Sequence, residues 1–170
     1  MYQALSKLDV RKSTGADKIE PLFLKAAASV IASPIASIFN LSLTSGEIPR
    51  SWKSAMVLPL LKGGDPSLPD NYRPISRLSV TAKIFESLVN EQVKHYLTAN
   101  EILSSTQSGF RQYHSTITAT TLVSNDIISA LDNKRSCAAL FVDLSKAFDC
   151  VNHDLLLQRL QHIGLSLIHI

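Results

Sequence analysis

The most informative segment of this 170-residue chain reads Phe141-Val142-Asp143-Leu144-Ser145-Lys146-Ala147-Phe148-Asp149. The apolar run over residues 137–142 predicts a buried strand, and Asp143 ends that strand with a carboxylate. A turn-like segment follows, with an aromatic ring at Phe148. A strand-end carboxylate beside free backbone carbonyls suits a hard cation such as Mg²⁺, which prefers oxygen ligands. The plainer interpretation is a turn-capping aspartate and a core phenylalanine, and the spacing alone leaves both open.

Outward from this segment, the sequence pattern predicts a mixed α+β chain. A charged loop is expected over residues 9–19, followed by a helix that begins at Pro21 and stops near Ser33 and Pro34. A second helix should run from there to Gly46. Residues 55–61 suit a strand that Pro59 confines to a sheet edge. The remaining expected elements are a loop over 62–70, an extended segment over 71–76, and helices over 79–97, 116–131 and 152–164.

Composition narrows the class of protein. The hydrophobic fraction of 45% excludes wholesale disorder, and a net charge of +3 permits a nucleic-acid partner without requiring one. The longest apolar stretch, residues 22–43, is interrupted by a lysine, a proline and an asparagine, so no membrane span is expected. Cys137 and Cys150 are too few for a disulfide framework or a four-cysteine zinc site, which favours a reducing, intracellular setting. The five histidines lack metal-ligand spacing.

Residues 141–149 resemble motif A of reverse transcriptases, and most of all those of non-LTR, LINE-like retrotransposons of the jockey or CR1 type. Further segments resemble other blocks of that family in the same order. They are Lys12-Ser13-Thr14-Gly15-Ala16-Asp17, Trp52-Lys53 with Leu60-Leu61-Lys62-Gly63-Gly64-Asp65, Asn71-Tyr72-Arg73-Pro74-Ile75-Ser76 with Lys83-Ile84-Phe85-Glu86, and Gln107-Ser108-Gly109-Phe110-Arg111 with His114-Ser115-Thr116.

The resemblance implies an α+β fold, namely the fingers and partial palm of a right-hand polymerase, truncated. In this interpretation residues 1–50 are a helical element preceding the fingers, and residues 51–135 are the fingers. Residues 136–164 are the start of the palm. Residues 165–170 match what the end of a sequencing-library adapter would encode, and are interpreted as a candidate non-native tail.

The resemblance also implies roles for single residues. Asp143 corresponds to the first catalytic aspartate, which together with the carbonyl of Leu144 binds Mg²⁺, or Mn²⁺, in a two-metal site. Lys62 and Arg73 correspond to the finger cations that hold the triphosphate of the incoming dNTP. Phe148 corresponds to the aromatic gate that leaves no room for a ribose 2′-hydroxyl.

Other residues of the matched blocks receive weaker assignments. Arg111 is interpreted either as a contact to the template backbone or as packing within the fingers, and the sequence does not separate the two. Gln107, Gly109 and Phe110 are expected to be structural, and Asp149 to order the turn after Asp143 rather than to bind metal. The implied partners are an RNA template, a DNA primer and dNTPs, without a membrane, and the implied location is the nucleus.

The family also needs a later Asp-Asp pair, and the sequence contains no Asp-Asp dipeptide. We therefore expect the 170-residue chain by itself to be inactive. Two alternative hypotheses remain at this point: a non-catalytic nucleic-acid-binding fragment, and the product of a decayed pseudogene. Exposed apolar surface around Leu140, Val142 and Leu156 is expected to make the chain poorly soluble.

Overall fold

The computed structural model of the chain describes residues 1–144 and 147–165. These form two compact units, one of residues 1–95 with the C-terminal segment that begins at Leu160, and one of residues 96–159. The described elements mix helices with a two-stranded sheet, as expected for an α+β chain. Apart from Leu165, the candidate non-native tail lies outside the described residues. The predicted domain boundaries stay predictions.

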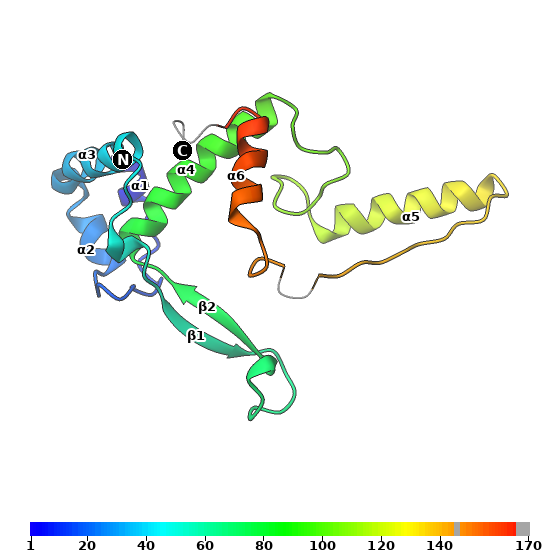
Figure 1. Ribbon diagram of the computed structural model, residues 1–170, viewed down its shortest axis with the longest axis horizontal. Helices are drawn as coiled ribbons and strands as arrows, with labels where there is room; N and C mark the ends of the chain where they lie inside the picture. The colour runs from blue at the N-terminus through cyan, green and yellow to red at the C-terminus, as the bar shows by residue number, and fades with distance from the viewer. Residues whose placement is uncertain (145–146, 166–170) are drawn as a thin grey trace. The chain divides into compact units, whose positions relative to one another are not determined.

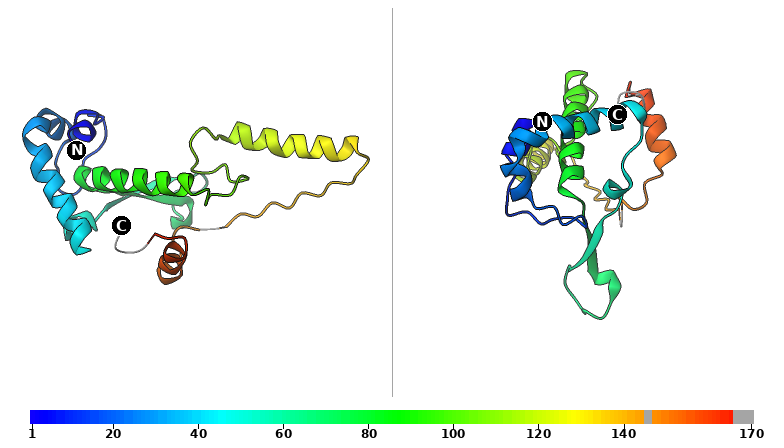
Figure 2. Two further views of the ribbon diagram at one scale, coloured as in Figure 1. Left: turned by 90° about the horizontal axis from the view of Figure 1, so that it is seen from above. Right: turned by 90° about the vertical axis from the view of Figure 1, so that its left-hand side faces the viewer.

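The first unit has a small helical core. Its helices are α1 (Tyr2–Ser6), α2 (Pro21–Ala26), α3 (Ala28–Ser45) and the first part of α4 (Val80–Ala99). Figures 1 and 2 show α1, α2 and α3 gathered beside the first half of α4. The buried apolar side chains that join them are Leu5, Leu24, Ala28, Phe39, Val80, Ile84 and Phe85. Burial of these side chains is what stabilises the arrangement, since each leucine, isoleucine, valine or phenylalanine contributes about 1.5–3 kcal/mol when fully removed from water.

Three aromatic rings close one end of this core. The ring of Phe39 lies edge-on to both Trp52 and Phe85, with centroid separations of 5.2 and 5.0 Å. The rings of Trp52 and Phe85 are 5.4 Å apart. Trp52 ends the short 3₁₀ turn η1 (Arg50–Trp52), which directly precedes the sheet. The aromatic cluster therefore fixes where the chain leaves the helices and enters the sheet.

The predicted helix break at Pro34 is wrong. Pro34 lies inside α3, and the break falls at Ala27, which separates α2 from α3. A proline within a helix removes one backbone hydrogen bond, here the bond to the carbonyl of Val30. Val30 is three-quarters exposed, so water can satisfy that carbonyl. The helix is also retained because Ala28, Phe39 and Ser42 must share one buried face. As predicted, Gly46 ends α3 in a left-handed conformation, with φ at 69°.

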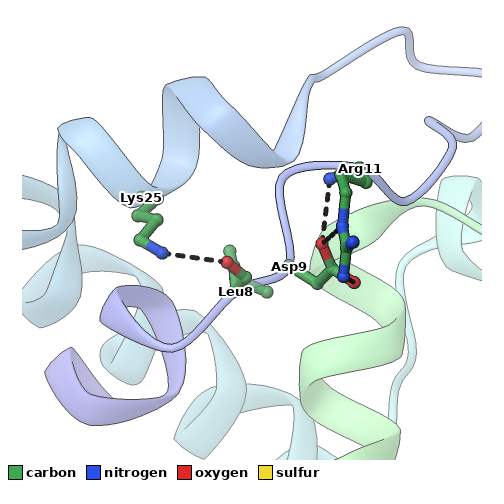
Figure 3. Close-up of polar contacts among 4 residues, drawn as sticks. All are labelled: Leu8, Asp9, Arg11 and Lys25. Atoms are coloured by element: carbon green, nitrogen blue, oxygen red, sulfur yellow. Dashed lines mark hydrogen bonds and ion pairs between the residues drawn. The ribbon is translucent and has the colours of Figure 1, made fainter.

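The N-terminal loop is tied down by local polar contacts. The guanidinium of Arg11 lies 3.1 Å from the Asp9 carboxylate, and the Lys25 ammonium donates to the carbonyl of Leu8 (Figure 3). The hydrogen bonds from Arg11 hold the pKa of Asp9 below its ordinary value. This ion pair is exposed, so its role is to shape the loop rather than to stabilise the fold strongly.

The same loop docks onto the junction between the sheet and α4. Arg77 donates to the carbonyl of Thr14 at 2.9 Å, and Lys83 donates to the carbonyl of Ser13 at 3.4 Å. Gly15 lies so close that an added Cβ would come within 2.5 Å of the backbone of Ser79. Only glycine fits this close approach.

Gly15→Ala should therefore destabilise the first unit by about 1–3 kcal/mol, because rigid backbone atoms of Leu78 and Ser79 would have to move. Urea unfolding followed by far-UV circular dichroism measures this. Gly109→Ala is the matched control, since a Cβ there meets nothing within 4 Å. Equal midpoints for the two variants would show that the loop is not docked as described.

The sheet is a single antiparallel hairpin of β1 (Met56–Leu61) and β2 (Tyr72–Arg77), close to the predicted segments. It extends away from α1, α2 and α3 of the same unit (Figures 1 and 2). The amide of Lys62 donates to the carbonyl of Asn71, so these two residues form a hydrogen-bonded pair. Along an antiparallel ladder every second pair is hydrogen-bonded, counted from this one. Pro59 and Pro74 face each other at a position without ladder bonds. The two prolines therefore cost no ladder bond, and each removes an outward N–H from an edge, as expected for edge strands.

Helix α4 begins where the sequence predicted it. The buried hydroxyl of Ser79 accepts the amide of Ala82 at 3.1 Å and caps the helix. In the second unit, α5 (Thr116–Asp132) also matches its predicted range. Ser115 and Thr118 start it with a reciprocal capping box, each side chain accepting the other's amide. The last helix, α6 (His153–His162), is capped by Asn152, which accepts the amide of Leu155.

The buried strand predicted over residues 137–143 is wrong. Residues 137–144 form no regular secondary structure, and the chain runs back from the end of α5 as an open trace (Figure 1). Leu140, Phe141 and Val142 are 90%, 87% and 76% exposed. A strand needs a neighbour for its amides, and among the described residues only β1 and β2 pair. The expected exposure of Leu140, Val142 and Leu156 is confirmed.

One helix in the described part of the chain, α3, is long and apolar enough to cross a membrane by length and composition. Core helices of soluble proteins pass the same test. In this chain, α3 contributes Ala28 and Phe39 to the helical core.

Candidate functional site

The hairpin brings two candidate cations together. Arg73 pairs with Leu60 in the register, and Lys62 follows two positions after Leu60. Side chains two positions apart in a strand leave on the same face, so Lys62 and Arg73 share one face of the hairpin. Such diagonal neighbours lie about 7–8 Å apart across the two strands, close enough for both side chains to contact one polyanion. Both residues are exposed.

The tip of the hairpin between these cations is an ordered loop. The chain reverses direction over residues 62–71. Gly63 and Gly64 have φ angles of 141° and 82°, which glycine adopts readily and other residues only with strain. The Asp65 carboxylate accepts the amide of Ser67 at 2.8 Å, which lowers the pKa of Asp65. The 3₁₀ turn η2 (Pro69–Asn71) then leads into β2.

The candidate metal-binding residues are in the second unit. Asp143 and Leu144 are both exposed and follow the open segment 137–142. A carboxylate and a backbone carbonyl are the kind of oxygen ligands that Mg²⁺ prefers. Across residues 1–144 and 147–165, no three histidine, cysteine or acidic side chains gather where they could hold a metal ion. The donors fit Mg²⁺ in kind, and the described residues supply only part of a coordination shell.

The candidate gate, Phe148, contacts a second aromatic ring. The rings of Phe110 and Phe148 lie edge to face, with centroids 6.1 Å apart. They are 84% and 80% exposed, so the interpretation of Phe148 as a core residue is wrong. Phe110 has a positive φ of 60°, an uncommon conformation for a bulky residue. The contact joins the Gln107–Arg111 block to the motif A segment, which spacing in the sequence could not show.

Arg111 takes part in the packing of its own loop. Its guanidinium donates to the carbonyl of Ser104 at 2.8 Å, and the Gln107 side chain donates to the carbonyl of Gly109. These contacts agree with a structural role for Gln107 and with the packing interpretation of Arg111. The bond to Ser104 uses one of the five N–H donors of the Arg111 guanidinium. A template contact by Arg111 remains a prediction.

The predicted site residues thus fall into two groups. Lys62 and Arg73 lie together in the first unit, whereas Arg111, Asp143, Leu144 and Phe148 are in the second. Sequence reasoning missed Asn71 and Tyr72, whose side chains bind loop carbonyls at the hairpin tip. A loop rich in glycine and proline leaves carbonyls that neighbouring side chains must satisfy, and that pattern could have pointed to them. The two cysteines are free and exposed.

A family model gives an independent comparison. The model described as reverse transcriptase (RNA-dependent DNA polymerase) matches residues 60–169, which include β2, α4, α5 and the motif A segment. This range holds every candidate site residue named above.

Curated relatives extend the match to nearly the whole chain. The chain is 36% identical over 96% of its length to a probable RNA-directed DNA polymerase from transposon BS of Drosophila melanogaster. It is 31% identical over 94% of its length to the RNA-directed DNA polymerase from the mobile element jockey of the same organism. It is 26% identical over 75% of its length to a Pol polyprotein from retrotransposable element R2 of Popillia japonica. The chain spans only 18%, 18% and 17% of these relatives.

Proposed function

Because this chain belongs to the reverse transcriptase (RNA-dependent DNA polymerase) family, we propose that it supplies the nucleotide-binding fingers of an RNA-directed DNA polymerase from a non-LTR retrotransposon. The observation that supports this most is the placement of Lys62 and Arg73 on one face of a protruding hairpin. The reaction would copy an RNA template by extending a DNA primer with dNTPs. Residues 51–135 would be the fingers and residues 136–164 the start of the palm, and the polymerase would act in the nucleus.

The hairpin cations would bind and orient the triphosphate. Lys62 offers a compact ammonium, and Arg73 offers a planar guanidinium that can contact two phosphate oxygens at once. Their charge would also offset the charge that accumulates on the leaving pyrophosphate. Both side chains are exposed, so a ligand can reach them from solvent.

In the complete polymerase, Asp143 and the carbonyl of Leu144 would hold Mg²⁺. Such ions lower the pKa of an attacking hydroxyl and stabilise negative charge on phosphoryl groups. Further carboxylates would have to come from an Asp-Asp pair, which the 170 residues lack. The 170-residue chain by itself would therefore bind nucleotide without incorporating it.

Triphosphate binding tests this proposal on the chain as it is. In an NMR titration of the ¹⁵N-labelled chain with dTTP at low ionic strength, Lys62→Ala and Arg73→Ala should each raise the dissociation constant about five- to tenfold. Lys94→Ala, an exposed cation on α4, is the matched control and should have little effect. If all three variants bind dTTP equally, the hairpin is not the triphosphate site.

A further inference from the structure

The loop at the hairpin tip is held by two side chains at the start of β2. The Asn71 amide donates to the carbonyl of Asp65 at 2.9 Å, and the Tyr72 hydroxyl donates to the carbonyl of Pro66 at 2.9 Å. The backbone amide of Lys62 donates to the carbonyl of Asn71 at 2.7 Å. These three bonds connect the end of β1, the middle of the loop and the residues directly before Arg73.

We propose that Asn71 and Tyr72 are positioning residues that hold the hairpin tip so that Lys62 and Arg73 bind the same triphosphate. This inference rests on the proposed function of the two cations. Lys62 is the last residue held by the ladder before two glycines, so its position depends on the path of the loop. Arg73 follows directly after the two side chains that fix that path.

The residues that line the loop show why it needs such contacts. Gly63 and Gly64 give the backbone wide freedom, and ordering flexible residues costs about 1–2 kcal/mol each. A loop that is ordered before the ligand arrives does not lose that entropy on binding. The Asn71 side chain also packs against Gly64, where an added Cβ would come within 3.0 Å of its nitrogen.

The register shows that the side chain of Tyr72 lies on the hairpin face that does not carry the two cations. It pairs with Leu61, so its side chain leaves the face opposite to Lys62 and Arg73. Its hydroxyl reaches a carbonyl of the loop. Any effect of that hydroxyl on triphosphate binding must therefore act through the shape of the tip.

The test removes only the hydroxyl. Tyr72→Phe should weaken dTTP binding to the 170-residue chain about two- to tenfold, the effect of one lost hydrogen bond, while the urea midpoint stays nearly unchanged. The amide resonances of Gly63 and Gly64 should shift in the free protein. Tyr113→Phe, at a tyrosine 91% exposed, is the matched control and should change neither quantity.

A rescue variant makes the test specific. Incorporating 4-aminophenylalanine at residue 72 keeps a donor near the carbonyl of Pro66 and should restore most of the affinity. If Tyr72→Phe binds dTTP like the wild type, or if the amino variant fails to restore binding, the inference is wrong. If Lys62→Ala and Arg73→Ala also leave binding unchanged, the proposed function of the hairpin fails instead, and the two failures are distinguishable.

Discussion

Asp143→Asn in the longer polymerase to which we assign this chain should lower DNA synthesis on an RNA template by about a thousandfold or more. The substitution keeps the shape of the side chain and removes its charge, so a metal ion loses an anionic ligand. Removing one preorganised electrostatic contact from an active site typically costs on the order of 10²–10³ in rate, and an anionic metal ligand should cost at least as much. Primer extension with single-turnover kinetics measures the loss.

Asp149→Asn is the matched control for this experiment. It makes the same chemical change at a second exposed aspartate six positions later in the sequence, which we expect to order the turn rather than to bind metal. It should retain most of the activity. If Asp143→Asn keeps more than a tenth of the wild-type rate, or if the two variants lose activity equally, the assignment of Asp143 is wrong.

Helices α4, α5 and α6, and the two segments that become β1 and β2, could be predicted because local chemistry decides them. Ser79 and Asn152 cap α4 and α6, and both residues stand in the sequence directly before an apolar periodic segment. The glycines and prolines of residues 63–69 similarly mark the loop between the apolar run at 55–61 and the extended segment at 71–76. These features depend on neighbours a few positions away, so a single sequence contains the information.

The strand expected over residues 137–143 failed for the opposite reason. Its apolar side chains are those of a buried strand, but a strand forms only when another segment supplies hydrogen-bond partners. None of the described residues does so, and Leu140 stays exposed. Pro34 shows the same limit, because the shared burial of Ala28 and Phe39 keeps α3 continuous through a residue that locally favours a break.

The candidate site contains features of both kinds, some decided by local sequence and some by contacts between separate segments. The placement of Lys62 and Arg73 on one face of the hairpin follows from its register, in which Arg73 pairs with Leu60. The sequence predicted the two extended segments, but it did not predict that register. The contacts of Asn71 and Tyr72 with loop carbonyls, and of Phe110 with Phe148, join residues whose types do not specify each other. Only the arrangement in space reveals them.

Phe148→Val in the longer polymerase should raise the incorporation of ribonucleotides relative to deoxyribonucleotides on the order of 100-fold. An aromatic ring against C2′ of the incoming sugar excludes a hydroxyl by sterics, and valine would leave room for it. Discrimination by the fit of a small group is worth about 1–3 kcal/mol, or 10–200-fold. Competing incorporation of UTP and dTTP by primer extension measures the ratio. Phe23→Val, at an exposed phenylalanine of α2, is the matched control.

The contact between Phe110 and Phe148 leads to a second prediction about sugar discrimination. It lies edge to face with Phe148, and such pairs contribute about 0.5–1.5 kcal/mol. Phe110→Ala should therefore relax the same discrimination by a smaller factor, about two- to tenfold, because Phe148 keeps its size and loses its support. In the double variant, Phe110→Ala should add little to Phe148→Val, since the ring that it supports is gone. Independent, multiplying effects would mean that the two rings act at separate places, and no increase with Phe148→Val would mean that residue 148 is not the gate.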